Sequence, residues 1–131
     1  RLHPRSMWKK VLPLLLVPCL LAGCSSTFTN LTAQRQPRNP NHLYPVGVAF
    51  NTRQQSLRWE TIQPVVVVGT ESYPLRQTVL MKHRWEGLVP VPAGTNLIHY
   101  YYKFDFLYTD FGGPRSDSAF SPLYRLHILE R

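Results

Sequence analysis

The strongest constraint on this fold is the alternation of apolar and polar side chains between Leu97 and Tyr108. Side chains of a β-strand point alternately to the two faces of a sheet, so a period of two residues places one set in a core and the other in solvent. We therefore expect a half-buried strand here. The core set comprises Ile98, Tyr100, Tyr102, Phe104, Phe106 and Tyr108, and the outer set comprises His99, Tyr101, Lys103 and Asp105.

Four further segments have the pattern of strands and are separated by turns rich in Gly, Pro, Asn and Ser. No window in this part of the chain has the 3.6-residue period of an amphipathic helix. We therefore predict one all-β domain over residues 43–131, a single antiparallel β-sandwich of about seven strands. The four segments are 44–50, 57–68, 77–85 and 123–129.

Aromatic and apolar residues of these segments are assigned to the core. In the third segment Val79, Met81 and Trp85 share one face, and His83 falls on the same apolar phase. Trp59 and Trp85 are both expected to be buried, because aromatic rings contribute a large part of the area that a core buries.

The N-terminal part has the pattern of a secretory signal. Lys9 and Lys10 follow Met7, an apolar run covers residues 11–21, and small residues precede Cys24. The run is shorter than the roughly 20 residues that a transmembrane helix needs. We expect residues 7–23 to be a signal peptide, and residues 1–6 to be upstream sequence that was taken as translated by mistake.

The four residues Leu21-Ala22-Gly23-Cys24 resemble the lipobox of bacterial lipoproteins. The resemblance implies that Leu21, Ala22 and Gly23 are recognised by signal peptidase II, which cuts before Cys24. It also implies that Cys24 carries a diacylglyceryl group on sulfur and an acyl group on nitrogen, with no other cofactor. In enterobacterial lipoproteins, an Asp after the Cys tends to retain the protein in the inner membrane. Residue 25 is Ser, so the resemblance implies sorting to the outer membrane.

The chain after Cys24 divides into a tether and the domain. Residues 24–42 contain few large apolar residues and include Pro37 and Pro40, so we expect a flexible tether carrying the lipid. Four of the 15 basic residues precede Cys24 and all seven acidic residues follow it, which leaves a net charge of +4 in place of +8. That charge is not clustered, so the expected partners are the membrane and an envelope protein or glycan, and not nucleic acid.

The turn Pro92-Ala93-Gly94-Thr95 before the aromatic strand resembles the corresponding turn of fibronectin type III and related immunoglobulin-like domains. In that family a corner Tyr follows, for which Tyr100 is the nearest candidate, and Trp59 would be the core Trp. Starch-binding modules resemble the same stretch, with Trp85, a Pro-Val-Pro turn and a Tyr-rich strand. The resemblances imply either an immunoglobulin-like binding or structural module or, alternatively, a carbohydrate-binding module.

No pattern of residues indicates catalysis or a metal site. The four His residues beyond Cys24 have no paired spacing, and there is no Gly-x-Ser-x-Gly motif. We therefore expect a protein that is not an enzyme and holds no metal. A long loop predicted over 110–122 is the expected contact surface, with Arg115 and Asp117 in the loop and Tyr101 exposed on the neighbouring strand.

Overall fold

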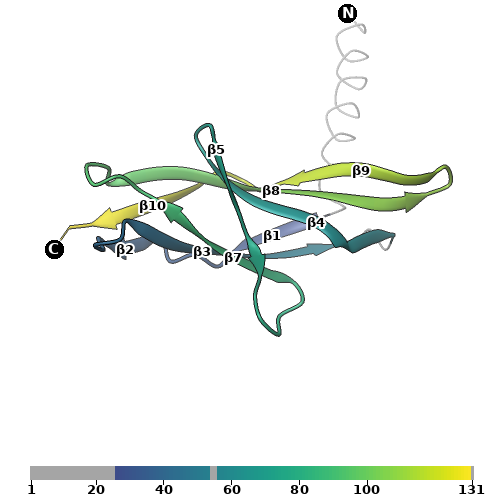
Figure 1. The fold of residues 1–131 in the computed structure, drawn as a ribbon, viewed down its shortest axis with the longest axis horizontal. Coiled ribbons are helices and arrows are strands. Elements are labelled where there is room, and N and C mark those ends of the chain that lie inside the picture. The colour runs from purple at the N-terminus through teal and green to yellow at the C-terminus, as the bar shows by residue number, and fades with distance from the viewer. Residues whose placement is uncertain (1–25, 54–55, 131) are drawn as a thin grey trace, which may run out of the picture.

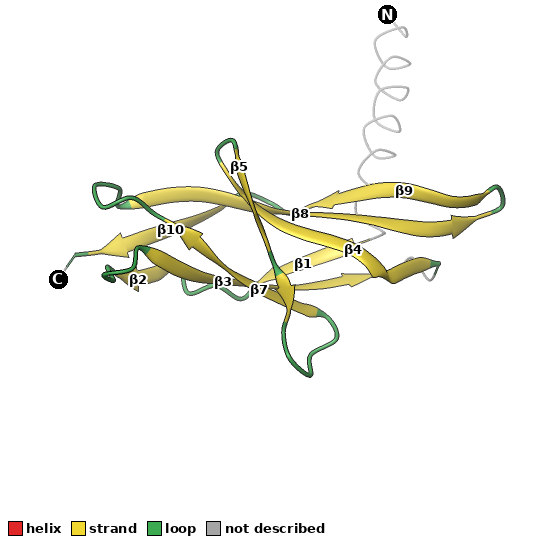
Figure 2. Ribbon diagram, in the orientation of Figure 1, coloured by secondary structure: helices red, strands yellow, loops and turns green. Residues whose placement is uncertain are grey.

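The computed structural model describes residues 26–53 and 56–130, and all the regular structure within them is β-strand. Figure 2 shows these strands joined by short loops. The predicted all-β class is confirmed, with ten strands in the described part of the chain. They are β1 (Ser26–Asn30), β2 (Arg35–Pro37), β3 (Leu43–Thr52), β4 (Leu57–Val68), β5 (Glu71–Pro74), β6 (Arg76–Gln77), β7 (Arg84–Pro90), β8 (Leu97–Asp110), β9 (Gly113–Phe120) and β10 (Tyr124–Leu129).

The strands form two sheets that lie one above the other in Figure 1. One sheet has the order β1-β3-β7-β6, and the other has the order β2-β10-β8-β4-β5, with β9 paired to the distal part of β8. Immunoglobulin folds have strands A, B, E and D in one sheet and C, F and G in the other. Taking β1, β3, β7 and β6 as A, B, E and D, and β4, β8 and β10 as C, F and G, reproduces that arrangement. The predicted immunoglobulin-like sandwich is confirmed.

The core lies between the inner faces of β3 and β8, where the alternation predicted it. Tyr44, Phe50, Tyr100, Tyr102 and Phe104 are all fully buried. The rings of Phe50 and Phe104 meet across the two sheets with their centroids 4.9 Å apart. Burying a side chain of this size stabilises a fold by about 1.5–3 kcal/mol, so these rings dominate the packing energy.

The segment expected to be a flexible tether instead contributes two strands. β1 pairs antiparallel with β3 from Ser26, and β2 pairs parallel with β10. The Phe28 ring packs against Phe50 and Phe104, with centroids 4.9 and 5.2 Å away. Gln36 is buried, and its side-chain amide donates hydrogen bonds to two backbone carbonyl groups. The prediction was wrong because edge strands held by hydrogen bonds do not need an apolar period.

A cluster of polar side chains joins β1 to the core of the other sheet. The Tyr102 hydroxyl lies 2.7 Å from Asn30 Oδ1, 2.9 Å from Thr32 Oγ1 and 3.0 Å from the carbonyl oxygen of Gly47. Asn30 also donates from Nδ2 to the Tyr100 hydroxyl over 2.8 Å. Burial raises the pKa of Tyr102 well above its ordinary value of 10.0. Tyr100 therefore contacts β1 through its hydroxyl.

The segment 110–122 is not a long loop. β8 continues to Asp110, Phe111 and Gly112 form the turn, and β9 pairs back along β8 from Gly113 to Phe120. Gly113 has a φ of 109°, a backbone conformation that favours glycine over other residues. β9 was missed because most of its side chains are exposed on both faces, so the strand has no alternating pattern.

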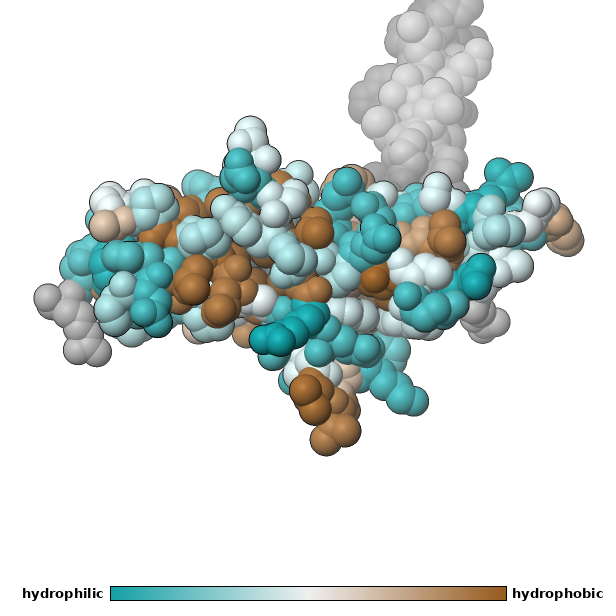
Figure 3. Space-filling view, in the orientation of Figure 1, coloured by the Kyte–Doolittle hydropathy of each residue, from teal (hydrophilic) through white to brown (hydrophobic). Residues whose placement is uncertain are grey.

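The segment 77–85 is also not one strand. β6 ends at Gln77 and β7 begins at Arg84, and the intervening 78–83 loop projects from the sandwich, as the lower loop in Figure 2. Its tip is apolar, and it is the brown projection at the bottom of Figure 3. Val79, Met81 and His83 are therefore exposed rather than directed into the core.

The chain crosses from one sheet to the other just before this loop. β5 pairs with β4 in one sheet and β6 pairs with β7 in the other, so residues 71–77 pass diagonally between them in Figure 1. Gly87 on β7 permits this crossing, because a Cβ atom there would lie 2.7 Å from Leu75 Cδ2 and 3.2 Å from the carbonyl oxygen of Pro74.

Candidate functional site

A groove of about 500 Å³ opens beside the crossing segment, between β4 and the 78–83 loop. We call it the Trp59 groove. Its volume lies in the range of ligand-binding pockets, which are mostly apolar with a few polar groups. The lining residues are Trp59, Glu60, Ile62, Pro64, Leu75, Gln77, Lys82, His83 and Trp85.

An irregularity in β4 positions Trp59 at the groove. The pairing of β4 with β8 shifts between Arg58 and Gln63, so extra residues of β4 bulge out of the ladder. The Thr61 hydroxyl bridges the bulge, since it donates to the carbonyl oxygen of Arg58 over 2.6 Å and accepts the backbone N–H of Leu107 over 2.9 Å. Bulges redirect side chains and often occur next to functional sites.

Aromatic rings connect the groove to the core. The ring of Trp85 packs edge-on against Phe104 with centroids 5.0 Å apart, and Trp59 lies parallel to Trp85 at 6.2 Å. The His83 ring contacts Trp59 edge-on at 4.7 Å. Trp85 is 5% exposed and is buried as predicted, whereas Trp59 is 37% exposed, so its assignment to the core was wrong. The buried Trp of this sandwich is therefore on β7.

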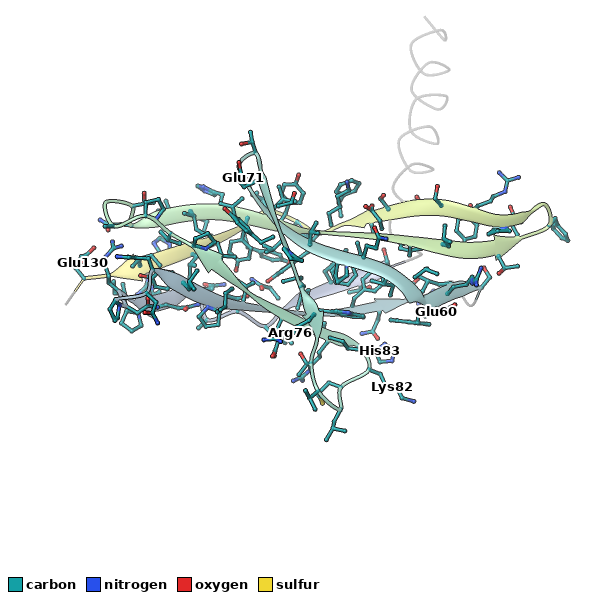
Figure 4. The ribbon with its side chains drawn as sticks, viewed as in Figure 1. Glu60, Glu71, Arg76, Lys82, His83 and Glu130 are labelled. Carbon is teal, nitrogen blue, oxygen red and sulfur yellow. The ribbon has the colours of Figure 1, made fainter. Side chains whose placement is uncertain are left out.

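Polar and charged groups form the rest of the lining. Gln77 donates from Nε2 to the carbonyl oxygens of Met81 and Lys82, at 3.3 and 2.8 Å, which holds the loop against β6. Glu60 forms an ion pair with Arg58 at 3.3 Å. Lys82 has no acidic partner among the described residues. Figure 4 shows Lys82 and His83 projecting from the 78–83 loop, and Glu60 at the beginning of β4.

These groups can contact a ligand through apolar surface and through hydrogen bonds. Among the described residues, Glu60 is the one carboxylate that lines the groove. In residues 26–53 and 56–130, no three His, Cys, Asp or Glu side chains are grouped so that they could hold a metal ion. The arrangement offers an indole face, aliphatic contacts and several hydrogen-bonding groups to a ligand.

The structure does not bring Tyr101, Arg115 and Asp117 together. Tyr101 lies half-buried on the outer face of β8 and packs against Phe120, with ring centroids 6.4 Å apart. The register places Asp117 opposite Phe106 and Arg115 opposite Tyr108, which puts both on the core-facing side of the β8–β9 hairpin. The three residues therefore belong to two opposite faces.

Arg115 and Asp117 each already have a local partner. Arg115 forms an ion pair with Asp110 at 3.0 Å, and Asp117 accepts the backbone N–H of Ser118 over 2.8 Å. Near Tyr101, Lys103 and Asp105 form an ion pair at 3.8 Å. These side chains therefore make local contacts on two faces of the hairpin and do not form one contact surface.

Sequence reasoning missed the polar part of the groove. His83 and Gln77 come together because the 78–83 segment folds as a loop, and nothing in their spacing indicates this. One signal was available for Trp59. The apolar phase of β4 is set by Leu57 and Trp59 and then by Ile62 and Pro64, and the step of three residues between the two pairs is typical of a bulge.

Two groups of predictions lie outside the described residues. One is the signal peptide predicted over residues 7–23, together with the site around its end formed by Leu21, Ala22, Gly23 and Cys24. The other is the prediction for residues 1–6. Over the part of the chain that is described, no helix has the length and apolar character needed to span a membrane.

Comparisons with known proteins give one structural likeness. No protein-family model and no curated protein matches the chain. Among solved structures, the chain is similar to AggA, the major subunit of aggregative adherence fimbriae type I from Escherichia coli. The two are 10% identical, the alignment covers 79% of this chain and 95% of that chain, and the TM-score is 0.39. The topology assigned above therefore rests on the strand pairing itself.

Proposed function

We propose that this chain is a non-catalytic, lipid-anchored module of the bacterial envelope, attached through Cys24 and sorted to the outer membrane. The order of basic residues, apolar run, small residues and Cys in the N-terminal sequence supports the anchor. The immunoglobulin-like sandwich then presents the Trp59 groove to a partner protein of the envelope.

The position of β1 changes how the anchor would hold the domain. Cys24 precedes Ser26 by two residues, and Ser26 is already paired with Thr52. An extended chain spans at most about 3.5 Å per residue, so the two steps of chain from this anchor to the start of β1 can reach no more than about 7 Å. A lipid on Cys24 would therefore hold the sandwich close against the bilayer, and not at the end of a long tether.

The exposed indole of Trp59 is the observation that carries the binding role. It stands in a groove with apolar residues and a polar rim, which is the setting of residues that dominate protein–protein affinity. A glycan is the second candidate, because an exposed indole also suits sugar rings. Stacking on a glycan would be stronger with a second exposed ring in the same plane, and Trp85 is buried behind Trp59. We therefore favour a protein partner.

The anchor is tested by replacing its cysteine. In protein expressed from Met7, Cys24→Ala should abolish incorporation of labelled palmitate and stop cleavage of the signal. Cys19→Ala is the matched control, since that residue lies within the signal peptide and should leave labelling unchanged. Undiminished palmitate labelling of the Cys24→Ala protein would refute the anchor.

The groove is tested by photo-crosslinking in cells. A benzophenone amino acid at Lys82 should give a discrete adduct, and the same group at exposed Arg125, on the outer face of the other sheet, should not. Trp59→Ala should remove the adduct at position 82. An adduct that survives this substitution would argue against the groove. A shift of tryptophan emission on titration with oligosaccharides, lost in Trp59→Ala, would favour the glycan instead.

A further inference from the structure

The 78–83 loop exposes apolar side chains in a way that packing does not explain. Val79 is 81% exposed and Leu80 is 96% exposed, and Met81 beside them is also exposed. Single exposed apolar residues are common on proteins, whereas three in succession at a projecting tip are not. Figure 3 shows that this tip stands clear of the rest of the surface in that view.

The backbone at the tip is a tight turn with one residue in a strained conformation. Met81 N–H donates to the carbonyl oxygen of Thr78 over 3.0 Å, so residues 78–81 form a turn, and Leu80 at its third position has a φ of 66°. Glycine or asparagine is favoured at such a position, because a Cβ atom makes this conformation costly. The sequence has leucine there, although its backbone is strained and its side chain is exposed. A leucine at such a position points to contact with something other than the rest of this domain.

Positive charges surround the tip. Arg76, Lys82 and Arg84 are exposed and have no ion-pair partner among the described residues. The nearest acidic residue in the strand register is Glu86, which lies opposite Arg76 on the neighbouring strand. The Glu86 carboxylate accepts a hydrogen bond from the Thr78 hydroxyl. We call the three cations the basic collar. Figure 4 shows Arg76 where the chain enters the loop and Lys82 projecting from the loop itself.

We propose that the tip formed by Val79, Leu80 and Met81 inserts into the surface of an anionic lipid bilayer, with the basic collar contacting the phosphate groups. Apolar side chains flanked by cations are the chemistry that binds the boundary between headgroups and acyl chains. The loop joins β6 to β7, in the sheet whose other edge strand is β1. In Figure 1 it projects away from the sheet that contains β8. The tip would be a second membrane contact, which would orient a domain whose proposed lipid anchor at Cys24 precedes β1.

The proposal is tested on the mature protein, purified from bacterial membranes and reconstituted into vesicles of phosphatidylethanolamine and phosphatidylglycerol. An NBD fluorophore on Leu80→Cys should show blue-shifted emission and should be quenched by lipids that carry a nitroxide near the headgroup. Leu129→Cys is the matched control, because Leu129 is an exposed leucine at the far end of β10. Its fluorophore should stay in water and remain unquenched.

Two changes separate insertion from stability. With the fluorophore on Val79→Cys, Leu80→Asn should abolish quenching and leave the thermal unfolding midpoint unchanged or slightly higher, since asparagine tolerates the positive φ. Lys82→Ser or Arg84→Ser should each reduce the ratio of inserted to free loop about fivefold, the effect of about 1 kcal/mol per cation at an anionic surface.

Three results would overturn the proposal. One is equal quenching at positions 80 and 129. The second is quenching at position 80 that is unchanged on phosphatidylcholine vesicles, since the basic collar would then have no part. The third is NBD emission at position 80 that stays typical of water on vesicles of every composition, which would favour a protein as the partner of the tip. Failure of the proposed anchor can be told apart from failure of tip insertion. Mass spectrometry of the N-terminal peptide would show whether Cys24 carries acyl groups, independently of the fluorophore signal.

Discussion

The centre of the sandwich and its edges are held by different forces. The facing strands β3 and β8 bury Phe50, Tyr100 and Phe104 completely, so apolar burial dominates there. The edge strand β1 is held by its backbone ladder with β3, by the half-buried ring of Phe28 and by side-chain hydrogen bonds to Tyr100 and Tyr102. The hairpin strand β9 is mostly exposed. Stability should therefore fall steeply from the centre to the edges, and four substitutions or conditions can test this.

The largest effect is expected at the centre. Phe104→Ala should lower the free energy of unfolding by about 3–5 kcal/mol, because it removes a fully buried ring and leaves a cavity between the two sheets. Phe120→Ala is the matched control on β9, where the ring is 60% exposed, and should cost less than about 1 kcal/mol. Denaturant unfolding measures both. Equal losses would show that the hairpin is as much a part of the core as β8.

Edge strands of this kind also limit what the sequence can predict. β3 and β8 were predicted with nearly correct bounds, because one face of each is buried and the other is not. β1, β2 and β9 were missed, since an exposed or hydrogen-bonded strand has no apolar period to detect. The buried Gln36 is an example, because its partners are backbone carbonyl groups that no side-chain pattern reveals.

The candidate site was harder to predict than the fold. Trp59 was predicted to lie in the core, and His83 was assigned to a strand although it lies in a loop. Both depend on where the chain leaves the regular ladder, at the bulge in β4 and in the 78–83 loop. Such departures are set by tertiary contacts, such as the hydrogen bonds from Gln77 to the loop, and not by local propensity.

The joint between edge and centre should give the next largest effect. Tyr102→Phe removes the hydroxyl that contacts Asn30, Thr32 and Gly47, and should cost about 1–3 kcal/mol because buried polar groups lose their partner. Hydrogen exchange should rise first in β1, which that hydroxyl holds. Tyr101→Phe, on the outer face of β8, is the control and should change little. Unchanged protection of β1 in Tyr102→Phe would mean that the ladder with β3 and the Phe28 ring secure the edge without the hydroxyl.

The same hydroxyl predicts a loss of stability at high pH. Burial raises the pKa of Tyr102 above the ordinary value of 10.0, and burial followed by the neighbouring Tyr100 raises the pKa of Tyr124. The folded state thus holds protons that the unfolded chain releases near that ordinary value, so the stabilisation is complete below it and is lost as pH rises through the folded pKa. Denaturant unfolding at pH about 8 and about 11 should show the loss. It should be smaller in Tyr102→Phe, and an equal loss in the two proteins would assign it to other groups.

The smallest effect is expected at the far end of the hairpin. Arg115 and Asp110 form an ion pair at 3.0 Å, with 59% and 38% of their side chains exposed, so solvent and salt screen their attraction. Arg115→Ala should therefore change the free energy of unfolding by about 0–1 kcal/mol, and by less as salt is added. Urea unfolding of the variant and the parent in low and high salt measures this. A loss of several kcal/mol would mean that the hairpin end unfolds together with the core. A near-neutral result would mean that the β8–β9 extension tolerates change in its charges without loss of the sandwich, because its energy comes mainly from the backbone ladder with β8.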